Sequence, residues 1–417
     1  MNNPSLLLLV FLALYALHVF TRVFLQILNR SSLKLHGHEI PGVFSGVVDV
    51  ETLKKMRDYT LADTSVGSAE ELITDIAIII VMLGGVLPWL LGLDLFQNTH
   101  FILSGLMFFL LIGFLLTLLG IPFDLYRTFV IERRFSFSTI TASLWLRDLA
   151  LSLAVSAVLA GILLGGLLGL IHVAPALWWL LAWLFFILFQ LLITWIYPVL
   201  IAPLFNRFEP IEDRQLTEKI TDTFHRAGLQ VKGIYMMDAG KRSRHTNAYF
   251  TGIGRTKRIV LYDTLLENHT PDEISVVLAH ELGHWKKGHV RLQIALSFLL
   301  SLVVLYTAYL LIPNPFIYEA FGLSSVTPYA GLLILAVLFK PVSFFLTPLG
   351  SMLSRYFERQ ADAYALSLSG SPAFLIQALK KLAKDNLSNL HPHPLYAWFY
   401  YSHPPLLDRI ERLQSTD

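Results

Sequence analysis

Two histidines and a glutamate stand close together in the segment His-Glu-Leu-Gly-His at residues 280–284. In an α-helix, His280 and His284 lie one turn apart on the same face, so both imidazoles can reach one zinc ion. Glu281 then lies beside the water that the metal activates, where a carboxylate can act as a general base. The motif therefore predicts a zinc centre that hydrolyses peptide bonds.

The residues around the motif indicate that it lies on a helix. Residues 270–273, Thr-Pro-Asp-Glu, form a capping box with proline at the first helical position. Apolar residues follow at helical spacing, and Gly288 after two lysines is typical of a helix C-terminus. We therefore expect the helix to begin two to three turns before His280.

A catalytic zinc site needs a third protein ligand and keeps a fourth position for water. His289 is the nearest candidate, but it does not fit the known register. The metzincin motif places glycine and histidine seven and ten residues after its first histidine, whereas Gly288 and His289 follow His280 by eight and nine. We instead expect His289 to be a polar residue at a membrane surface.

Glu358 and Asp362 are stronger candidates because they stand four residues apart in a segment with helical character. One carboxylate could bind the metal while the other accepts the N–H of a ligand histidine. The alternative is a solvated acidic face paired with Arg355 and Arg359. Spacing alone leaves both interpretations open.

The composition places these residues in a membrane protein. Of 417 residues, 55% are hydrophobic and 15% charged, and the mean hydropathy is +0.59. The chain contains no cysteine, which excludes disulfides, thiolate catalysis and cysteine-bound metal. No basic cluster is dense enough for nucleic acid.

Seven apolar stretches of about twenty residues could each span a bilayer. They cover residues 5–28, 72–93, 101–121, 148–171, 176–201, 290–312 and 329–351. Lysine and arginine fall on alternate connections, which predicts an outside N-terminus and a cytoplasmic location for residues 202–289 and for the C-terminal tail. We expect a mainly α polytopic protein with a cytoplasmic α+β metalloprotease domain. Its segments would be 1–201, 202–289, 290–352 and 353–417.

Polar or charged residues also lie within or at the edges of the spans, namely Asp75, Arg147, Asp148, Gln190 and Lys340. Such groups are costly in lipid unless they face protein or water. They indicate either a wet interior or paired charges between packed helices.

Residues 246–251 and 257–262 are rich in β-forming side chains and are joined by Gly252–Arg255, which predicts a β-hairpin. An exposed edge of this hairpin could bind an extended peptide by strand addition.

Four segments, 280–284, 357–365, 247–250 and 402–409, together resemble the integral-membrane metalloproteases called CAAX prenyl protease 1. The resemblance extends over essentially the whole chain, including the layout of the spans. It implies a gluzincin type of site and seven transmembrane helices that form a barrel around a chamber.

The resemblance also implies roles for individual residues. One Zn²⁺ per chain would be bound by His280, His284 and Glu358, with Asp362 supporting a ligand histidine. Glu281 would take the proton of the attacking water and pass it to the leaving amine.

Substrate contacts are implied at Asn247 and Ala248, and at His403 and Arg409, with His403 stabilising the oxyanion. Without the resemblance, Asn247 would be a turn-flanking residue, His403 a helix-entry residue and Arg409 a surface charge on the amphipathic helix 406–413. We expect His391 and His393 to be loop residues.

The implied reaction removes the last three residues, after the lipidated cysteine, from prenylated CAAX proteins or peptides. The bilayer is the other expected partner. Residues 413–417 contain no lysine-based retrieval signal for the endoplasmic reticulum, so we expect a bacterial inner membrane, or the endoplasmic reticulum membrane if the protein is eukaryotic.

Two other functions remain open. One is a quality-control protease for damaged membrane proteins, which would use the same zinc helix. The other is a transporter or channel with a structural zinc, which the presence of Glu281 and the absence of a visible internal repeat disfavour.

Overall fold

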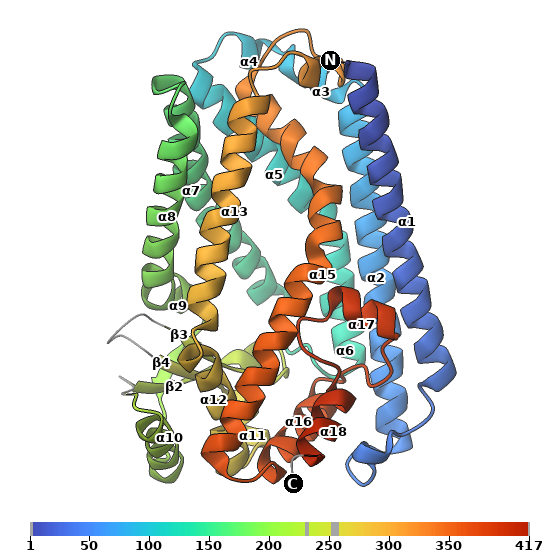
Figure 1. Cartoon of the computed structure of the whole chain (residues 1–417), viewed down its shortest axis with the longest axis vertical. Coiled ribbons are helices and arrows are strands. Elements are labelled where there is room, and N and C mark those ends of the chain that lie inside the picture. Colours follow the sequence, from blue (N-terminus) through green and yellow to red (C-terminus); the bar gives the residue numbers. More distant parts are fainter. Residues whose placement is uncertain (1–2, 230–232, 252–257, 416–417) are drawn as a thin grey trace.

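The computed structural model describes residues 3–229, 233–251 and 258–415. Long helices run along the long axis of the molecule, and a small sheet with shorter helices gathers at one end (Figure 1). The long helices are α1 (Pro4–His36), α2 (Val50–Leu83), α5 (Phe101–Tyr126), α7 (Ala142–Val173), α8 (Trp178–Ile196), α13 (His289–Leu311) and α15 (Pro328–Ser369). The predicted mainly helical class is confirmed.

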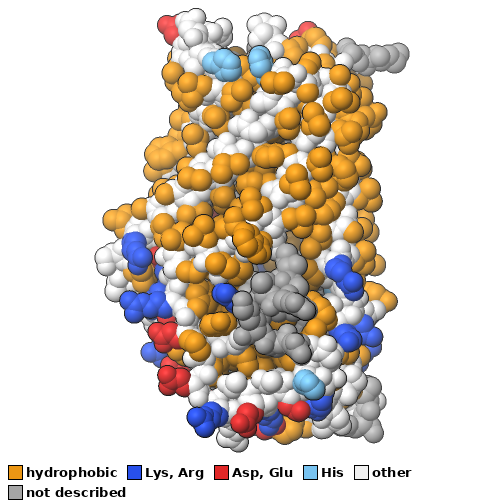
Figure 2. All heavy atoms as spheres, turned by 90° about the vertical axis from the view of Figure 1, so that its left-hand side faces the viewer, with side chains coloured by type: hydrophobic (Ala, Val, Ile, Leu, Met, Phe, Trp, Pro, Cys, Tyr) orange, Lys and Arg blue, Asp and Glu red, His pale blue; other side chains and the backbone are white. Residues whose placement is uncertain are grey.

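Six helices are long and apolar enough to cross a membrane within the described residues: Pro4–His36, Phe101–Arg134, Ala142–Val173, Trp178–Phe205, His289–Leu311 and Pro328–Ser369. Two of these extend α5 and α8 through the π-helical segments η2 (Arg127–Ile131) and η3 (Tyr197–Ile201) into α6 (Glu132–Arg134) and α9 (Ala202–Phe205). Figure 2 shows hydrophobic side chains over the upper and middle part of one face, with lysine and arginine side chains toward the lower end.

The bounds predicted for the second span, 72–93, were wrong. Its helix, α2, begins at Val50, where the Asp49 side chain accepts a hydrogen bond from the Thr52 N–H. It ends at Leu83, and Gly85, with a φ of 73°, separates it from α3 (Val86–Leu91). In Figure 1, α2 lies beside α1.

A buried charge cluster joins α1, α2 and α15. The Asp75 carboxylate lies 2.5 Å from Lys340 Nζ and 2.6 Å from Arg22 Nη2. It also accepts a hydrogen bond of 2.7 Å from the Tyr15 hydroxyl, and Arg22 Nε lies 3.3 Å from Glu71 Oε2. For Asp75 and Lys340, the structure therefore favours paired charges between helices.

The other polar residues predicted within spans behave differently. Asp148 receives two hydrogen bonds from the Arg242 guanidinium, of 2.6 and 2.9 Å, which ties α7 to the sheet region. Arg147 and Gln190 are exposed.

The sheet contains β1 (Phe208–Pro210), β2 (Gly233–Met237), β3 (Ala248–Thr251) and β4 (Arg258–Tyr262), in the spatial order β1-β2-β4-β3. Strands β2 and β4 are parallel, and the other pairs are antiparallel. The pairing of β3 with β4 confirms the predicted hairpin strands, whereas Gly252–Arg255 lies outside the described residues. Strand β3 forms one edge of the sheet.

Short helices gather at this end of the molecule. They are α10 (Arg214–Arg226), α11 (Asp263–Asn268), α12 (Pro271–Lys286), α16 (Ala373–Asp385), α17 (Pro394–Tyr400) and α18 (Leu406–Gln414), with η1 (Gly42–Phe44) and η4 (Ala239–Lys241) in connections; α17 packs on α15 and α1. Helices α3, α4 (Asp94–Gln97) and α14 (Phe316–Glu319) lie toward the opposite end (Figure 1). Helix α12 packs between the sheet, α10, α15 and α16, so its apolar residues belong to the core of this end.

Candidate metal centre

Helix α12 carries His280, Glu281 and His284, and both of its ends follow the predicted signals. The Thr270 side chain accepts from the Glu273 N–H, and the Glu273 carboxylate accepts from the Thr270 N–H. Gly288 follows the helix in the left-handed region, with a φ of 75°. The motif is therefore held on a helix whose register is fixed from both ends.

Three side chains from α12 and α15 converge on one point. His280 Nε2 lies 3.3 Å from His284 Nε2 and 3.3 Å from Glu358 Oε2. The other oxygen of Glu358 lies 3.2 Å from His284 Nε2. One ligand atom from each residue lies within 4.8 Å of the other two, as a shared metal ion requires.

A close approach of the two helices makes this geometry possible. A Cβ placed on Gly283 would lie 2.8 Å from the Ala361 Cα, which is closer than real Cβ contacts come. The glycine between the two histidines therefore lets α15 approach α12 until Glu358 reaches the imidazoles. We did not predict this role from the sequence, although small residues in both motif helices are a signal for it.

Asp362 lies one turn after Glu358 and contacts the other side of His280. Its Oδ1 is 2.9 Å from His280 Nδ1, so this ring can present Nε2 to the metal. Arg409 donates two hydrogen bonds to the same carboxylate, of 3.0 Å from Nε and 2.6 Å from Nη2. Glu358 and Asp362 are only 3% and 8% exposed, so a solvated acidic face was the wrong alternative.

The electrostatics of the site fit a cation. Burial lowers the pKa of His280, but the hydrogen bond with Asp362 and the adjacent Glu358 carboxylate outweigh this effect and raise the pKa to about 9. Glu358 Oε2 is buried and has no hydrogen bond of acceptable geometry within the described part of the chain. Two imidazoles and one carboxylate are also a donor set that catalytic zinc sites use. The residues present therefore fit a zinc ion.

The expected position of His289 was wrong, because its side chain is buried rather than at a membrane surface. Its Nδ1 lies 3.1 Å from His284 Nδ1, its Nε2 lies 2.8 Å from Gln360 Oε1, and its ring stacks on Phe357. His289 thus contacts the Nδ1 side of His284, away from the Nε2 atom that faces His280 and Glu358, and is not itself one of the candidate ligands.

A cavity of about 250 Å³ opens beside the three ligands. Asn247 and Ala248 line it from the edge of the sheet, Glu281 from α12, and His403 and Arg409 from the C-terminal region. The leucines at 375, 379 and 382 supply an apolar wall. The structure thus brings the candidate substrate-binding residues to one cavity.

Within this cavity the side chains differ in how they are engaged. Glu281 is half-buried and makes no hydrogen bond or ion pair with the residues that the structure describes. His403 Nδ1 lies 2.8 Å from Glu358 Oε2, although 62% of its side chain is exposed. The Asn247 amide oxygen accepts from the Ala248 N–H at 2.8 Å. Arg409 is bound to Asp362 and is not the free surface charge of the alternative interpretation.

A helix-borne His-His-Glu group with an adjacent glutamate, set on a multi-pass helical scaffold, is typical of membrane-embedded zinc metallopeptidases. Residues 29–207 match the family described as CAAX prenyl protease N-terminal, five membrane helices, and residues 210–417 match peptidase family M48. The chain belongs to the CAAX prenyl protease 1 family of zinc metalloproteases.

Similar proteins cover nearly the full chain. It is 32% identical over 406 residues to a CAAX prenyl protease 1 homolog of Arabidopsis thaliana, which covers 94% of each chain. It is 33% identical over 412 residues to CAAX prenyl protease 1 of Saccharomyces cerevisiae, covering 92% of this chain and 90% of the other. The crystal structure of S. mikatae Ste24p superposes with a TM-score of 0.89 at 30% identity and covers 99% of both chains.

Proposed function

We propose that this protein is a zinc endopeptidase that removes the three C-terminal residues from prenylated CAAX proteins or peptides. The observation that carries the catalytic part is Glu281, whose carboxylate has no partner among the described residues and lines the cavity next to the three candidate ligands. The substrate class comes from the named activity of the relatives.

One zinc ion per chain would be held by His280, His284 and Glu358. When bound, zinc supplies Lewis acidity, which makes water nucleophilic near neutral pH and polarises a carbonyl group. Glu281 accepts the proton of the attacking water as the new C–O bond forms. It then donates that proton to the leaving nitrogen as the C–N bond breaks.

The substrate would bind along the edge of the sheet. Strand β3 has one free edge, so the backbone around Asn247 and Ala248 can pair with an extended peptide. His403 faces Glu358 with Nδ1, so its Nε2 would donate to the developing oxyanion when both ring nitrogens carry a proton. Arg409 keeps Nη1 for a substrate carbonyl or carboxylate, while Nε and Nη2 orient Asp362.

The membrane part would present lipid-modified substrate to this site. We propose that α2 is a seventh span beside the six, and that the seven enclose a chamber. The distribution of lysine and arginine supports a cytoplasmic metal centre and C-terminus. The membrane would be the bacterial inner membrane or, in a eukaryote, the membrane of the endoplasmic reticulum. Residues 1–201 and 290–352 would form the membrane part, and residues 202–289 and 353–417 would form the protease part.

Purified protein incubated with matched prenylated and unprenylated CAAX peptides tests this proposal. We expect release of the C-terminal tripeptide, faster from the prenylated peptide, and loss of release when a zinc chelator is added. Cleavage that survives chelation would contradict the zinc mechanism. Equal rates on both peptides would indicate a general quality-control protease instead.

A further inference from the structure

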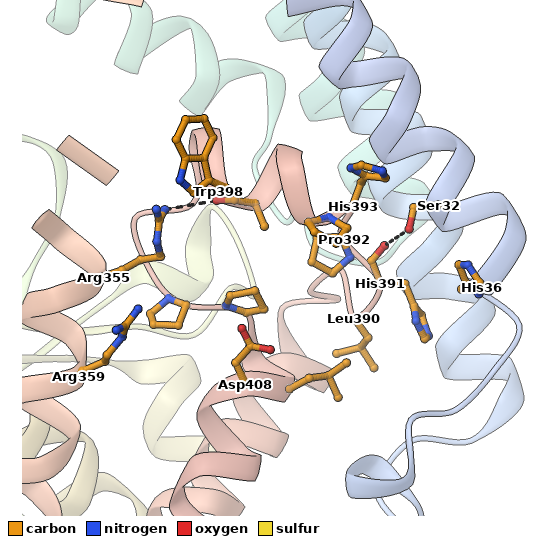
Figure 3. Close-up of a pocket in the computed structure, with 15 residues that line it drawn as sticks. Ser32, His36, Arg355, Arg359, Leu390, His391, Pro392, His393, Trp398 and Asp408 are labelled. Atoms are coloured by element: carbon orange, nitrogen blue, oxygen red, sulfur yellow. Dashed lines mark hydrogen bonds between the residues drawn. The ribbon is translucent and has the colours of Figure 1, made fainter. Parts of the chain in front are cut away.

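A second cavity, of about 730 Å³, lies apart from the one beside the metal ligands. It lies between the end of α1, helix α15, helix α17 and the segment that leads into α18 (Figure 3). Pro404 and Pro405 line it, whereas the preceding residue, His403, lines the cavity of the metal centre. The two cavities are therefore separated by one short stretch of chain.

This second cavity carries an excess of positive charge. Arg355 is 8% exposed, and its hydrogen bonds within the described part of the chain go to two backbone carbonyls, those of Tyr401 at 2.6 Å and Ala397 at 3.4 Å. Arg359, one turn further along α15, makes no ion pair or hydrogen bond with the described residues. Figure 3 shows both arginines on the same side of the cavity.

Asp408 is the one carboxylate among the lining residues, and it forms no ion pair with either arginine in the described structure. A buried guanidinium without a carboxylate is costly, because carbonyl groups offset its desolvation only in part. The side chains that line the cavity therefore do not neutralise Arg355, and an anion that enters the cavity would do so.

His393 adds a neutral donor to the same cavity. Its Nδ1 accepts a hydrogen bond from the Leu395 N–H, so the neutral ring carries its proton on Nε2. His391 is different, because its Nε2 lies 2.8 Å from the carbonyl oxygen of Glu39 and is already used. Two arginines on one side of the cavity and His393 on the side of α1 thus supply donors to it (Figure 3).

The position of the cavity indicates what kind of anion reaches it. Ser32 and His36 line it from the last turns of the membrane helix α1, on the side where the basic connections lie. Trp398 lines it as well and is 49% exposed, as is typical of residues at the headgroup level of a bilayer. Leu390 and several prolines make the remaining wall apolar.

We propose that this cavity binds the phosphate of an anionic phospholipid, with Arg355 and Arg359 as the charged ligands. Arginine matches phosphate geometry, and basic pockets between membrane helices on the cytoplasmic side suit lipid headgroups. The apolar wall accommodates the glycerol and the first part of an acyl chain. The site is independent of peptide hydrolysis, so it stands or falls separately from the proposed function.

The test measures thermal unfolding of the full-length protein in detergent while dioleoyl phosphatidylglycerol, dioleoyl phosphatidylcholine or inorganic phosphate is titrated. We expect only phosphatidylglycerol to raise the Tm of the wild type in a saturable way. Arg359→Gln should weaken its apparent affinity about fivefold, which corresponds to about 1 kcal/mol for one arginine near a membrane surface. Asp408→Asn should tighten it, because the competing carboxylate is gone.

Arg214→Gln, an exposed arginine on α10, is the matched control and should behave as the wild type. Equal phosphatidylglycerol titrations for the wild type and Arg359→Gln would overturn the proposal. An Arg359-dependent shift with inorganic phosphate alone would assign the site to free phosphate rather than lipid. A shift that depends on Arg359 only with a peptide bearing a free C-terminal carboxylate, and not with its amide, would assign the cavity to substrate.

Discussion

The charge cluster around Lys340 and the cluster around Glu358 both lie on α15, yet they differ in electrical balance. In the first, Arg22 and Lys340 face two carboxylates, Asp75 and Glu71. In the second, Glu358 and Asp362 face one permanent cation, Arg409, and because the pKa of His280 is raised, a proton on this ring supplies the other positive charge until a metal ion replaces it. The first cluster is balanced by fixed charges, whereas the second is balanced by a proton or by a metal ion.

This difference separates two uses of buried charge. A balanced cluster needs no further ion and can act as a tie between helices, although its desolvation cost limits the net stabilisation. A cluster in which one carboxylate is balanced by an exchangeable cation, a proton or a metal ion, meets the condition of a metal site. Substitutions should therefore affect catalysis and metal in one cluster, and stability in the other.

The largest effect is expected from Glu281→Gln, which keeps the size of the side chain but removes the base. The kcat for a CAAX peptide should fall by about 10² to 10⁴-fold, because general base catalysis is lost. Zinc content, measured by mass spectrometry, and Tm should stay at wild-type values. Glu358→Gln is the companion variant and should lose zinc as well as activity. A Glu281→Gln protein with undiminished turnover would remove Glu281 from the mechanism.

Asp75→Asn tests the balanced cluster and should show the opposite pattern. It leaves Arg22 and Lys340 without their shared carboxylate, and breaking a buried pair costs about 3–5 kcal/mol. We expect a clear drop in Tm, with zinc per folded protein unchanged. The double variant Asp75→Asn with Lys340→Met should recover part of the loss, since it removes one uncompensated cation. An unaltered Tm in the single variant would show that the cluster does not stabilise the packing of these helices.

His289→Ala refines the comparison within the metal centre. The substitution removes the ring that contacts His284 but replaces no ligand residue. Zinc affinity should therefore weaken by about 10- to 100-fold, because the orientation of His284 is no longer supported. Competition with a chelator measures this change. His225→Ala, an exposed histidine on α10, serves as control. Zinc affinity equal to that of the control would mean that His284 is positioned without His289.

The smallest effect is expected at the junction of membrane helices and protease, where His245 lies 3.2 Å from Glu132. Burial lowers the pKa of His245, but hydrogen bonds with Glu132 and Asn386 outweigh it, so the pKa is raised above 6.5. The folded state then binds the proton more tightly than the unfolded state. The stabilisation is complete below pH 6.5 and is lost as the pH rises through the raised pKa.

Thermal unfolding between pH 6 and pH 9 measures this loss. The Tm of the wild type should decrease over that interval by more than the Tm of His245→Gln. Parallel curves for the two proteins would exclude His245 as the titrating group.

Local signals in the sequence predicted α12 well. Its capping box and the terminal Gly288 act within a few residues, so no knowledge of packing was needed. The β3–β4 hairpin and most membrane helices were predicted for the same reason. The first half of α2 was missed because residues 50–70 mix apolar with charged side chains, and hydropathy detects continuous apolar stretches rather than helices.

Long-range contacts were the part that the sequence could not provide. Both Arg355 and Arg409 could have paired with Asp362, and only the packing of α18 against α15 decides for Arg409. The contact of His289 with His284 depends on the left-handed conformation of Gly288 between α12 and α13, which places the first residue of α13 against the motif helix. Spacing rules excluded His289 as a ligand but carried no information about this contact.

Helix α15 is long enough to connect the membrane part of the protein with the candidate metal centre. Lys340 is anchored between helices within the bilayer, and Glu358 lies 18 residues further along the same helix. Pro341 and Pro348 lie between these residues, and a change of about 5° in the direction of α15 after Pro348 would move Glu358, about 15 Å further along, by about 1 Å. Metal–ligand distances tolerate only about 0.2 Å. Glu358 therefore reaches the metal together with the two histidines at only one tilt of α15. Bilayer thickness affects the tilt of membrane helices, so zinc affinity should change with the thickness of the surrounding bilayer.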